Sequence, residues 1–291
     1  MPRTRTRRWR AAAVIAVGAL VLGIGGCVAF RHAKPFLLND GCQATVYGQD
    51  VQLDAEQAAV ATTIAGVGYR REVPKAAVTV AYATALQESK MRNVSYGDRD
   101  SVGIFQQRPS EGWGTRSQLQ DPVYAANKFF AALVKVPGYL RMPVYRAAQA
   151  VQHSADGTAY GQYEQVAGML STAFTGSAAR AVWCWYTPYK HSTAALASAG
   201  NQLTRTFGPL AEAGTALDPS GELAGTSGRA AMTVRVPATQ TGWAVATWSV
   251  AHAKTYGIRQ VRYAGYQWQA SSGEHGWKRR VGTPASRVEL G

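Results

Sequence analysis

Residues 83–109 read ATALQESKMRNVSYGDRDSVGIFQQRP, and they join the end of an apolar helical run to a polar loop. The run starts after Pro74 and covers residues 75–88, with apolar residues all round it, which predicts a central, buried helix. Glu88 is the one acid in the run. A loop over residues 93–101 follows, so the sequence predicts a single carboxyl group at the end of a buried helix, beside a polar loop.

The residues around Glu88 suit a general acid. Its helical neighbours one turn back are Thr84 and Ala85, which are small and uncharged. The negative end of the helix dipole also disfavours the charged form of a carboxyl group at this position. A carboxyl group held in its protonated form can protonate a leaving group near neutral pH. The alternative is a solvent-exposed glutamate that pairs with Lys90 or Arg92.

Two motifs in this stretch together resemble the lysozyme-like family of soluble lytic transglycosylases and goose-type lysozymes. In that family a catalytic Glu-Ser pair ends a helix, and a Gly-Leu-Met-Gln-like motif lines the sugar cleft. Glu88-Ser89 is similar to the first motif, and residues 103–106 (Gly-Ile-Phe-Gln) are similar to the second. The resemblance covers residues 42–184 and looks closest to membrane-anchored actinobacterial proteins. It implies a glycosidase whose partner is the peptidoglycan glycan strand.

The resemblance and the side-chain chemistry assign roles to individual residues. Glu88 is expected to act as acid and then as base. The residues expected to contact the sugar are Ser101, Gly103, Phe105, Gln106, Gln107 and Tyr160. Tyr163 is the alternative to Tyr160 as the family's late cleft tyrosine. Residues 147–152 (Ala-Ala-Gln-Ala-Val-Gln) depart from the family's helix motif, which leaves open a scaffold that binds wall glycan without cutting it.

A second carboxylate would decide the mechanism. A hydrolase needs a general base or a nucleophile across the sugar from the acid, and Asp98 and Asp100 are the candidates, one loop away. Both are also ordinary turn residues. The resemblance implies that a lytic transglycosylase needs only one glutamate, because the C6 hydroxyl of the sugar closes an anhydro ring. We therefore favour Glu88 acting alone, and the choice between a hydrolase and a transglycosylase stays open.

The N-terminus has the pattern of a membrane segment. Residues 1–10 carry five arginines and no acid, and residues 11–30 carry no charge. A helix over residues 11–30 would span about 30 Å, the hydrocarbon thickness of a bilayer. The arginines favour a cytoplasmic N-terminus, which predicts a single-pass membrane protein with its bulk outside the cytoplasm. The alternatives are a cleaved signal peptide and a lipoprotein signal at Cys27.

Charge and cysteine usage agree with a place outside the cytoplasm. The formal charge of +14 favours a polyanionic partner, and there the candidates are anionic wall polymers or lipid head groups rather than nucleic acid. Cys42 and Cys184 flank the region of the resemblance, and an oxidising setting predicts a disulfide between them, against the alternative of two buried thiols. The histidines lack metal-ligand spacing, so we expect no metal and no cofactor.

The remaining patterns predict a mainly α-helical protein. Helices are expected over residues 55–67, 75–88, 123–136, 143–153, 159–174 and 193–207, after a hairpin at residues 45–53. No long strand is expected between residues 54 and 207. Beyond a glycine-rich segment, strands are expected at residues 232–236, 259–263 and 266–270, with a helix at residues 241–254.

These elements predict a lysozyme-like helical domain after an N-terminal transmembrane helix, with a small α+β C-terminal module. The expected order is a cytoplasmic basic segment (1–10), a transmembrane anchor (11–30), a connector (31–41), a catalytic domain (42–208), a linker (209–231) and the module (232–291).

Overall fold

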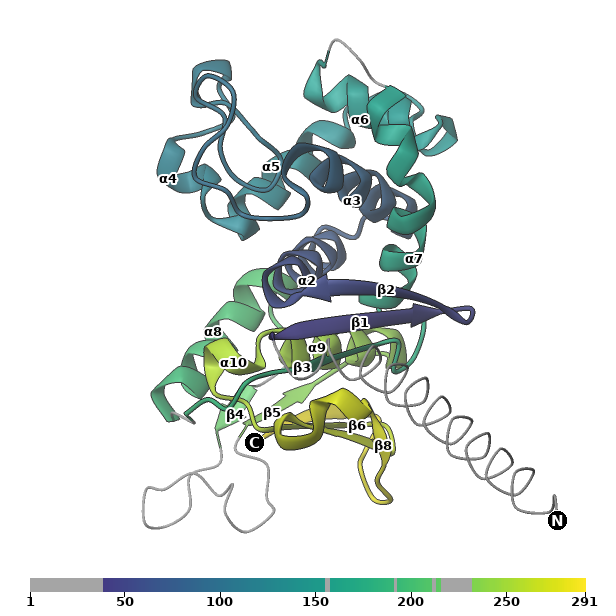
Figure 1. The fold of residues 1–291 in the computed structure, drawn as a ribbon, viewed down its shortest axis with the longest axis vertical. Coiled ribbons are helices and arrows are strands. Elements are labelled where there is room, and N and C mark those ends of the chain that lie inside the picture. The colour runs from purple at the N-terminus through teal and green to yellow at the C-terminus, as the bar shows by residue number, and fades with distance from the viewer. Residues whose placement is uncertain (1–38, 155–157, 191–192, 211–212, 216–231) are drawn as a thin grey trace, which may run out of the picture. The chain divides into compact units, whose positions relative to one another are not determined.

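The computed structural model describes residues 39–154, 158–190, 193–210, 213–215 and 232–291 (Figure 1). Contacts join Asp40–Gly291 into one compact unit. The basic segment at residues 1–10, the expected anchor at residues 11–30 and Cys27 lie outside the described residues. Within the described ranges, no helix combines the length and the apolar character needed to cross a bilayer.

The predicted fold class, a mainly α-helical protein with a small α+β C-terminal module, is wrong. Strands make up about 16% of the structure and helices about 51%. The described strands form two antiparallel sheets, one of three strands and one of six. The sequence patterns predict too few strands, because strand pairing joins segments that are far apart in the chain, whereas helical periodicity is a local pattern.

The three-stranded sheet carries the disulfide. It consists of β1 (Gly41–Val46), β2 (Gln49–Asp54) and β3 (Val182–Trp185), in the order β2-β1-β3. β1 and β2 form the predicted hairpin. β3 has only four residues, too few for its alternation to be recognised in the sequence. It lies antiparallel to β1 and places Cys42 opposite Cys184, and these two cysteines form the predicted disulfide.

The predicted helices are present, with ends that shift by a few residues. They are α2 (Ala55–Arg70), α3 (Lys75–Ser89), α5 (Pro122–Leu133), α6 (Val144–Gln152), α7 (Glu164–Phe174) and α8 (Thr193–Phe207). The short helix α4 (Arg116–Leu119) and the 3-10 turns η1 (Pro109–Glu111) and η2 (Tyr139–Arg141) were not predicted, and the 3-10 turn η3 (Thr158–Tyr163) replaces the first part of the helix expected over residues 159–174. The Asp54 side chain accepts a hydrogen bond from the backbone N–H of Gln57 and caps the start of α2. Asp121 caps α5 in the same way, ahead of a proline at the first helical position.

Helix α3 is central and buried, as predicted. Figure 1 shows it among α2, α5, α6 and α7, and each of these helices packs against it. Ala77, Ala81 and Ala85 are fully buried, and such small side chains let neighbouring helices approach closely. The Tyr82 hydroxyl donates a 2.7 Å hydrogen bond to the Ala61 carbonyl of α2. The last turn of α3, which carries Glu88, is therefore held in position by its neighbours.

The six-stranded sheet fills the C-terminal part of the chain. Its order is β4 (Ala213–Thr215), β5 (Met232–Arg235), β9 (Arg287–Leu290), β6 (Gln260–Tyr263), β7 (Tyr266–Gln269) and β8 (Lys278–Arg279). The sequence patterns predict β5, β6 and β7 and miss the short edge strands β4 and β8 and the inner strand β9. The helices here are α9 (Thr239–Ala251) and α10 (Ala253–Tyr256), with the 3-10 turn η5 (Ala270–His275).

The C-terminal sheet shares its core with the helices. Helix α9 packs against α2, β3, β6 and β9, and it is buried from Thr241 to Ala251. The Trp268 indole donates a hydrogen bond to the Cys184 carbonyl (2.9 Å), and the Trp277 indole donates one to Val182 (2.7 Å). The C-terminal sheet and the disulfide-bearing strand β3 therefore stabilise each other. The residue boundaries expected for the domains stay predictions.

Removal of the disulfide measures how far the three-stranded sheet depends on it. The bridged cysteines are 142 positions apart. The chain-entropy argument then gives about 5 kcal/mol, and native bridges commonly contribute about 2–5 kcal/mol. We expect Cys42→Ala/Cys184→Ala to lower the free energy of unfolding in urea by about 2–5 kcal/mol. A reducing agent should destabilise the wild type and leave the variant unchanged. Equal unfolding free energies for the two proteins would contradict this account.

Candidate active site

Glu88 and Tyr160 form the centre of the candidate site. Glu88 is half-buried in the last turn of α3, and Tyr160, in η3, is only 2% exposed. The Tyr160 hydroxyl donates a 2.6 Å hydrogen bond to Glu88 Oε1. Burial raises the pKa of Tyr160, and the hydrogen bond to Glu88 raises it further, so the phenol keeps its proton and stays a donor. The structure thus brings together two of the predicted site residues.

The cations close to Glu88 in sequence are engaged elsewhere. The Lys90 ammonium donates a 2.6 Å hydrogen bond to the Tyr163 hydroxyl. The Arg92 guanidinium pairs with Asp54 and Glu56 on α2 and its cap. No ion pair to Glu88 forms among the described residues. The expected alternative, a surface glutamate paired with Lys90 or Arg92, is therefore not what the structure shows, and Tyr160 rather than Tyr163 contacts the carboxylate.

A left-handed turn ends α3 directly after the carboxylate. Lys90 and Met91 both have positive φ angles, 55° and 61°. Their backbone N–H groups donate to the carbonyls of Leu86 and Ala85, which would otherwise lack partners at the helix end. The Met91 side chain is fully buried and anchors the turn in the core. The helix therefore ends at Ser89, one residue after Glu88, and the polar loop begins there.

Gly103 lets the loop pass close to α4. It has a φ of 79°, a region that L side chains avoid. A Cβ atom at this position would lie 2.4 Å from the Leu119 carbonyl oxygen, so a side chain has no room. The Gly103 N–H donates a 2.7 Å hydrogen bond to Val94, and Val102 forms a bridge with Gln107. The Gly-Ile-Phe-Gln segment is thus a tight turn whose glycine is required by both space and conformation.

Two helices fix consecutive carbonyl groups of this segment. The Ser89 hydroxyl, from α3, donates a 2.9 Å hydrogen bond to the Ile104 carbonyl. The Gln152 amide, from α6, donates a 2.8 Å hydrogen bond to the Phe105 carbonyl. Gln152 belongs to the helix that departs from the family motif, and no role for it was predicted. The one signal for Gln152 in the sequence is its place at the end of residues 147–152, the segment that stands where the family has its helix motif.

The residues expected to contact the sugar differ in how much of each side chain is exposed. Phe105 is fully buried and stacks on Phe129 with ring centroids 4.4 Å apart. Ser101 and Gln107 are 6% and 2% exposed, so both shape the loop from inside. Gln106 is half-buried, and its amide donates to the carbonyls of Tyr96 and Gly103. The contact of these residues with a sugar stays a prediction. In this conformation the side chains of Glu88 and Gln106 are partly exposed to solvent, whereas those of Phe105 and Gln107 are almost completely buried.

The two aspartates have different surroundings. Asp98 is a surface residue whose side chain is 92% exposed, beside Arg99. Asp100 accepts hydrogen bonds from the backbone N–H of Ser110 (2.8 Å), from the Ser110 hydroxyl (3.0 Å) and from Arg108 Nε (3.0 Å). The Ser110 backbone N–H, with Arg108, lowers the pKa of Asp100 to about 2. Such a carboxylate binds a proton weakly, and its contacts tie the loop to η1.

No cluster of three or more histidine, cysteine, aspartate or glutamate side chains suited to a metal ion occurs within the described ranges. No protein-family model matches the chain, and no curated protein sequence matches it. The site therefore rests on its own geometry: a half-buried carboxylate, a buried phenol that donates to it, and a turn fixed by two helices.

Gly103 and Gly112 give a matched test of the tight turn. Their φ angles are 79° and 78°, so an L residue is strained at both. A Cβ at Gly103 would clash with Leu119, whereas one at Gly112 has nothing within 4 Å. We expect Gly112→Ala to lower the free energy of unfolding by about 1 kcal/mol and Gly103→Ala by about 2–4 kcal/mol. Urea titration measures both, and equal losses would contradict the proposed constraint.

Asp100 should contribute to acid stability. Folding lowers its pKa from 3.8 to about 2, so its ionised form stabilises the folded state above pH 3.8, and this contribution is lost as the pH falls through 2. Asp100→Asn should therefore be less stable than wild type at neutral pH, with a difference that shrinks on acidification. Asp98→Asn controls for loss of a surface charge. Unfolding free energies across the pH range provide the measurement, and a difference independent of pH would contradict this assignment.

Proposed function

We propose that this protein is a peptidoglycan glycosidase that cleaves the bond between N-acetylmuramic acid and N-acetylglucosamine, with Glu88 as its acid. The hydrogen bond from the Tyr160 hydroxyl to Glu88 Oε1 is the observation that carries the proposal. It singles out this carboxyl group from the surface acids and fixes one of its oxygens. The resemblance of Glu88-Ser89 and of residues 103–106 to lytic transglycosylases and goose-type lysozymes supplies the substrate class.

Glu88 would transfer protons in two steps. As an acid it gives its proton to the glycosidic oxygen, and the bond from that oxygen to the anomeric carbon breaks. The resulting carboxylate accepts a hydrogen bond from Tyr160, which stabilises its negative charge. As a base it then takes a proton from the attacking group, which is either water or the C6 hydroxyl of the sugar. Lys90 and Arg92 do not pair with Glu88, because Lys90 binds Tyr163 and Arg92 binds Asp54.

The surroundings of the aspartates favour the single-carboxylate route. Asp100 already accepts three hydrogen bonds, two from Ser110 and one from Arg108, and Asp98 is open to solvent. Neither is held as a nucleophile or base would be. This favours the transglycosylase outcome, in which the C6 hydroxyl of the sugar is the nucleophile, over hydrolysis with a second carboxylate.

A non-catalytic scaffold is the second candidate function. Helix α6 departs from the family motif at residues 147–152, and its Gln152 amide is bound to the Phe105 carbonyl. Gln107 is also withdrawn from the surface. A wall-binding protein with an inactive cleft would have the same features.

Two observations support a place outside the cytoplasm, beside anionic wall polymers or lipid head groups. The Cys42–Cys184 disulfide is of the kind that persists in oxidising compartments. The second observation is a basic edge of the larger sheet, with Lys278, Arg279 and Arg280 exposed and the Arg180 guanidinium 4.3 Å from the centre of the Tyr266 ring. Cations gathered in this way attract polyanions.

Substitution of Glu88 tests the catalytic role. We expect Glu88→Gln to lower the rate of soluble muropeptide release from purified peptidoglycan by at least about a hundredfold, because an amide cannot donate the proton. Tyr160→Phe should give an intermediate loss. Glu164→Gln, at the start of α7, is the matched control and should keep the wild-type rate. Mass spectrometry of the products then separates anhydro ends from reducing ends.

The outcomes discriminate between the two candidates. Equal release by the wild type and Glu88→Gln would remove Glu88 from the chemistry. No release by either protein, with binding to peptidoglycan retained, would favour the scaffold.

A further inference from the structure

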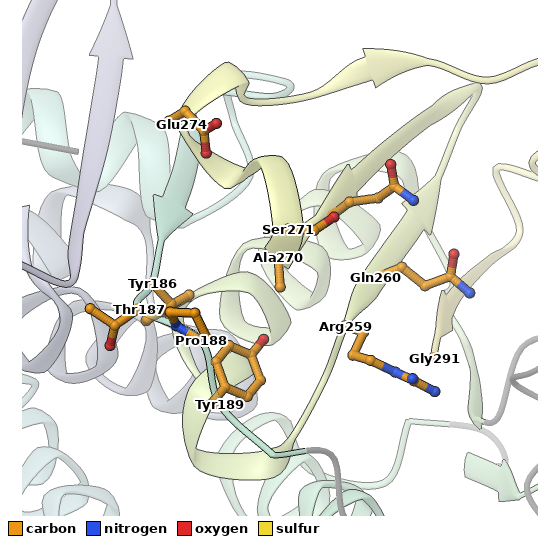
Figure 2. A pocket seen from close by; sticks show the side chains of 11 residues that line it. Tyr186, Thr187, Pro188, Tyr189, Arg259, Gln260, Ala270, Ser271, Glu274 and Gly291 are labelled. Carbon is orange, nitrogen blue, oxygen red and sulfur yellow. The ribbon is translucent and has the colours of Figure 1, made fainter. Parts of the chain in front are cut away.

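A pocket of about 790 Å³ lies between the segment that follows β3 and the larger sheet, and its side chains do not converge on one ligand (Figure 2). The segment contributes Tyr186 to Tyr189, and β6 with the residue before it contributes Gln260 and Arg259. Figure 2 shows the Arg259 and Gln260 side chains running away from the Tyr189 ring. The aromatic and the polar groups therefore do not face a single molecule, and we assign no ligand to this pocket.

The loop that joins α5 to α6, residues 134–143, leaves apolar side chains in solvent. No residue of this loop is buried, and Val134, Leu140 and Met142 are 46%, 55% and 36% exposed. The other large apolar side chains that are exposed in the described ranges stand apart from one another in the sequence: Tyr47, Tyr69, Tyr96 and Val281. Single exposed apolar residues are common on protein surfaces, whereas three in one short loop form an apolar patch, a feature of interaction sites.

The exposure of these side chains follows from a folded backbone. The Tyr139 N–H donates a 3.3 Å hydrogen bond to the Val136 carbonyl, and the Arg141 N–H donates a 2.9 Å hydrogen bond to the Gly138 carbonyl. Gly138 has a φ of 70°, which suits a glycine in a tight turn. The Val136 and Tyr139 side chains pack against the core. The loop is therefore anchored through these two residues and presents its three exposed apolar side chains outward.

The surroundings of the loop are basic, without acids to compensate the charge. Residues 122–155 contain four lysine or arginine residues and no aspartate or glutamate. Three of these cations, Lys135, Arg141 and Arg146, are exposed in the loop or at the start of α6. Within the described part of the chain none of the three pairs with a carboxylate. Apolar side chains and uncompensated positive charge thus occupy the same loop and its edge, a combination that favours an anionic partner.

We propose that this loop docks on the surface of an anionic lipid bilayer. The three exposed apolar side chains enter the boundary between head groups and acyl chains, and the three cations bind lipid phosphates. A polyanion in solution would pair with the cations and leave the apolar side chains in water. A stable protein–protein interface covers roughly 800 Å² and about 20–30 residues on each partner, which a loop of this length does not offer alone. An anionic lipid surface matches both kinds of side chain, and docking does not require the protein to cleave glycan.

Fluorescence from a dye in the loop tests the docking. The environment-sensitive dye NBD is attached at position 142 of the full-length Met142→Cys protein, with Cys27→Ser to leave one reactive thiol. We expect the emission to increase and to shift to shorter wavelength when vesicles of phosphatidylglycerol and phosphatidylcholine are added, because the dye leaves water. Vesicles of phosphatidylcholine alone should give a much smaller change. The matched control, Tyr47→Cys, carries the dye at the 89% exposed tip of the β1–β2 hairpin, and its emission should stay unchanged.

Removal of charge separates docking on anionic lipid from other contacts. Lys135→Gln and Arg141→Gln change exposed side chains, and each should lower the docking constant measured by the dye about fivefold, since one cation near an anionic membrane contributes that much to binding. Lack of an emission change at position 142 with anionic vesicles, or an equal change at position 47, would overturn the proposal. A change with soluble polyphosphate and none with vesicles would assign the loop to a polyanion in solution and also overturn it. None of these outcomes depends on glycan cleavage, so the docking and the proposed function can fail separately.

Discussion

The burial of helix α3 is the constraint on which the rest of the structure depends. Its small side chains, such as Ala77 and Ala81, allow α2, α5, α6 and α7 to pack around it. Because α3 is buried on all sides, a polar side chain on it can reach the protein surface at the end of the helix. Glu88 occupies that end, and the left-handed pair Lys90–Met91 stops the helix immediately afterwards. The position of the carboxylate follows from packing, and its hydrogen bond to Tyr160 follows from where η3 lies against α3.

Local patterns predict a large part of this fold. Caps and apolar periodicity give the helices, a central glycine gives the β1–β2 hairpin, and the paired cysteines give the disulfide. The larger sheet and the short strand β3 are harder to predict, because their pairings join segments that are far apart in sequence. Helix α9 illustrates the difficulty, since its burial all round depends on β3, β6 and β9 rather than on its own sequence.

In the candidate site, too, some features can be predicted from the local sequence and others depend on tertiary packing. Glu88 follows from its place at the end of the apolar run together with the resemblance of Glu88-Ser89 to the family motif, and Gly103 follows from that resemblance. The choice between Tyr160 and Tyr163 does not, because it depends on how η3 packs over the end of α3. The roles of Gln152 and of Asp100 also require the structure, since each acts on a backbone segment that another element brings close. Sequence predicts the chemical group, and tertiary packing decides what it contacts.

A structure of the Glu88→Gln variant with a bound wall tetrasaccharide tests the central claim most directly. If Glu88 is the acid, a glycosidic oxygen should lie about 3 Å from the side-chain amide at position 88, with the Tyr160 hydroxyl bonded to the other side of that group. A glycan that binds elsewhere on the protein, with no glycosidic oxygen within hydrogen-bond reach of position 88, would contradict the account.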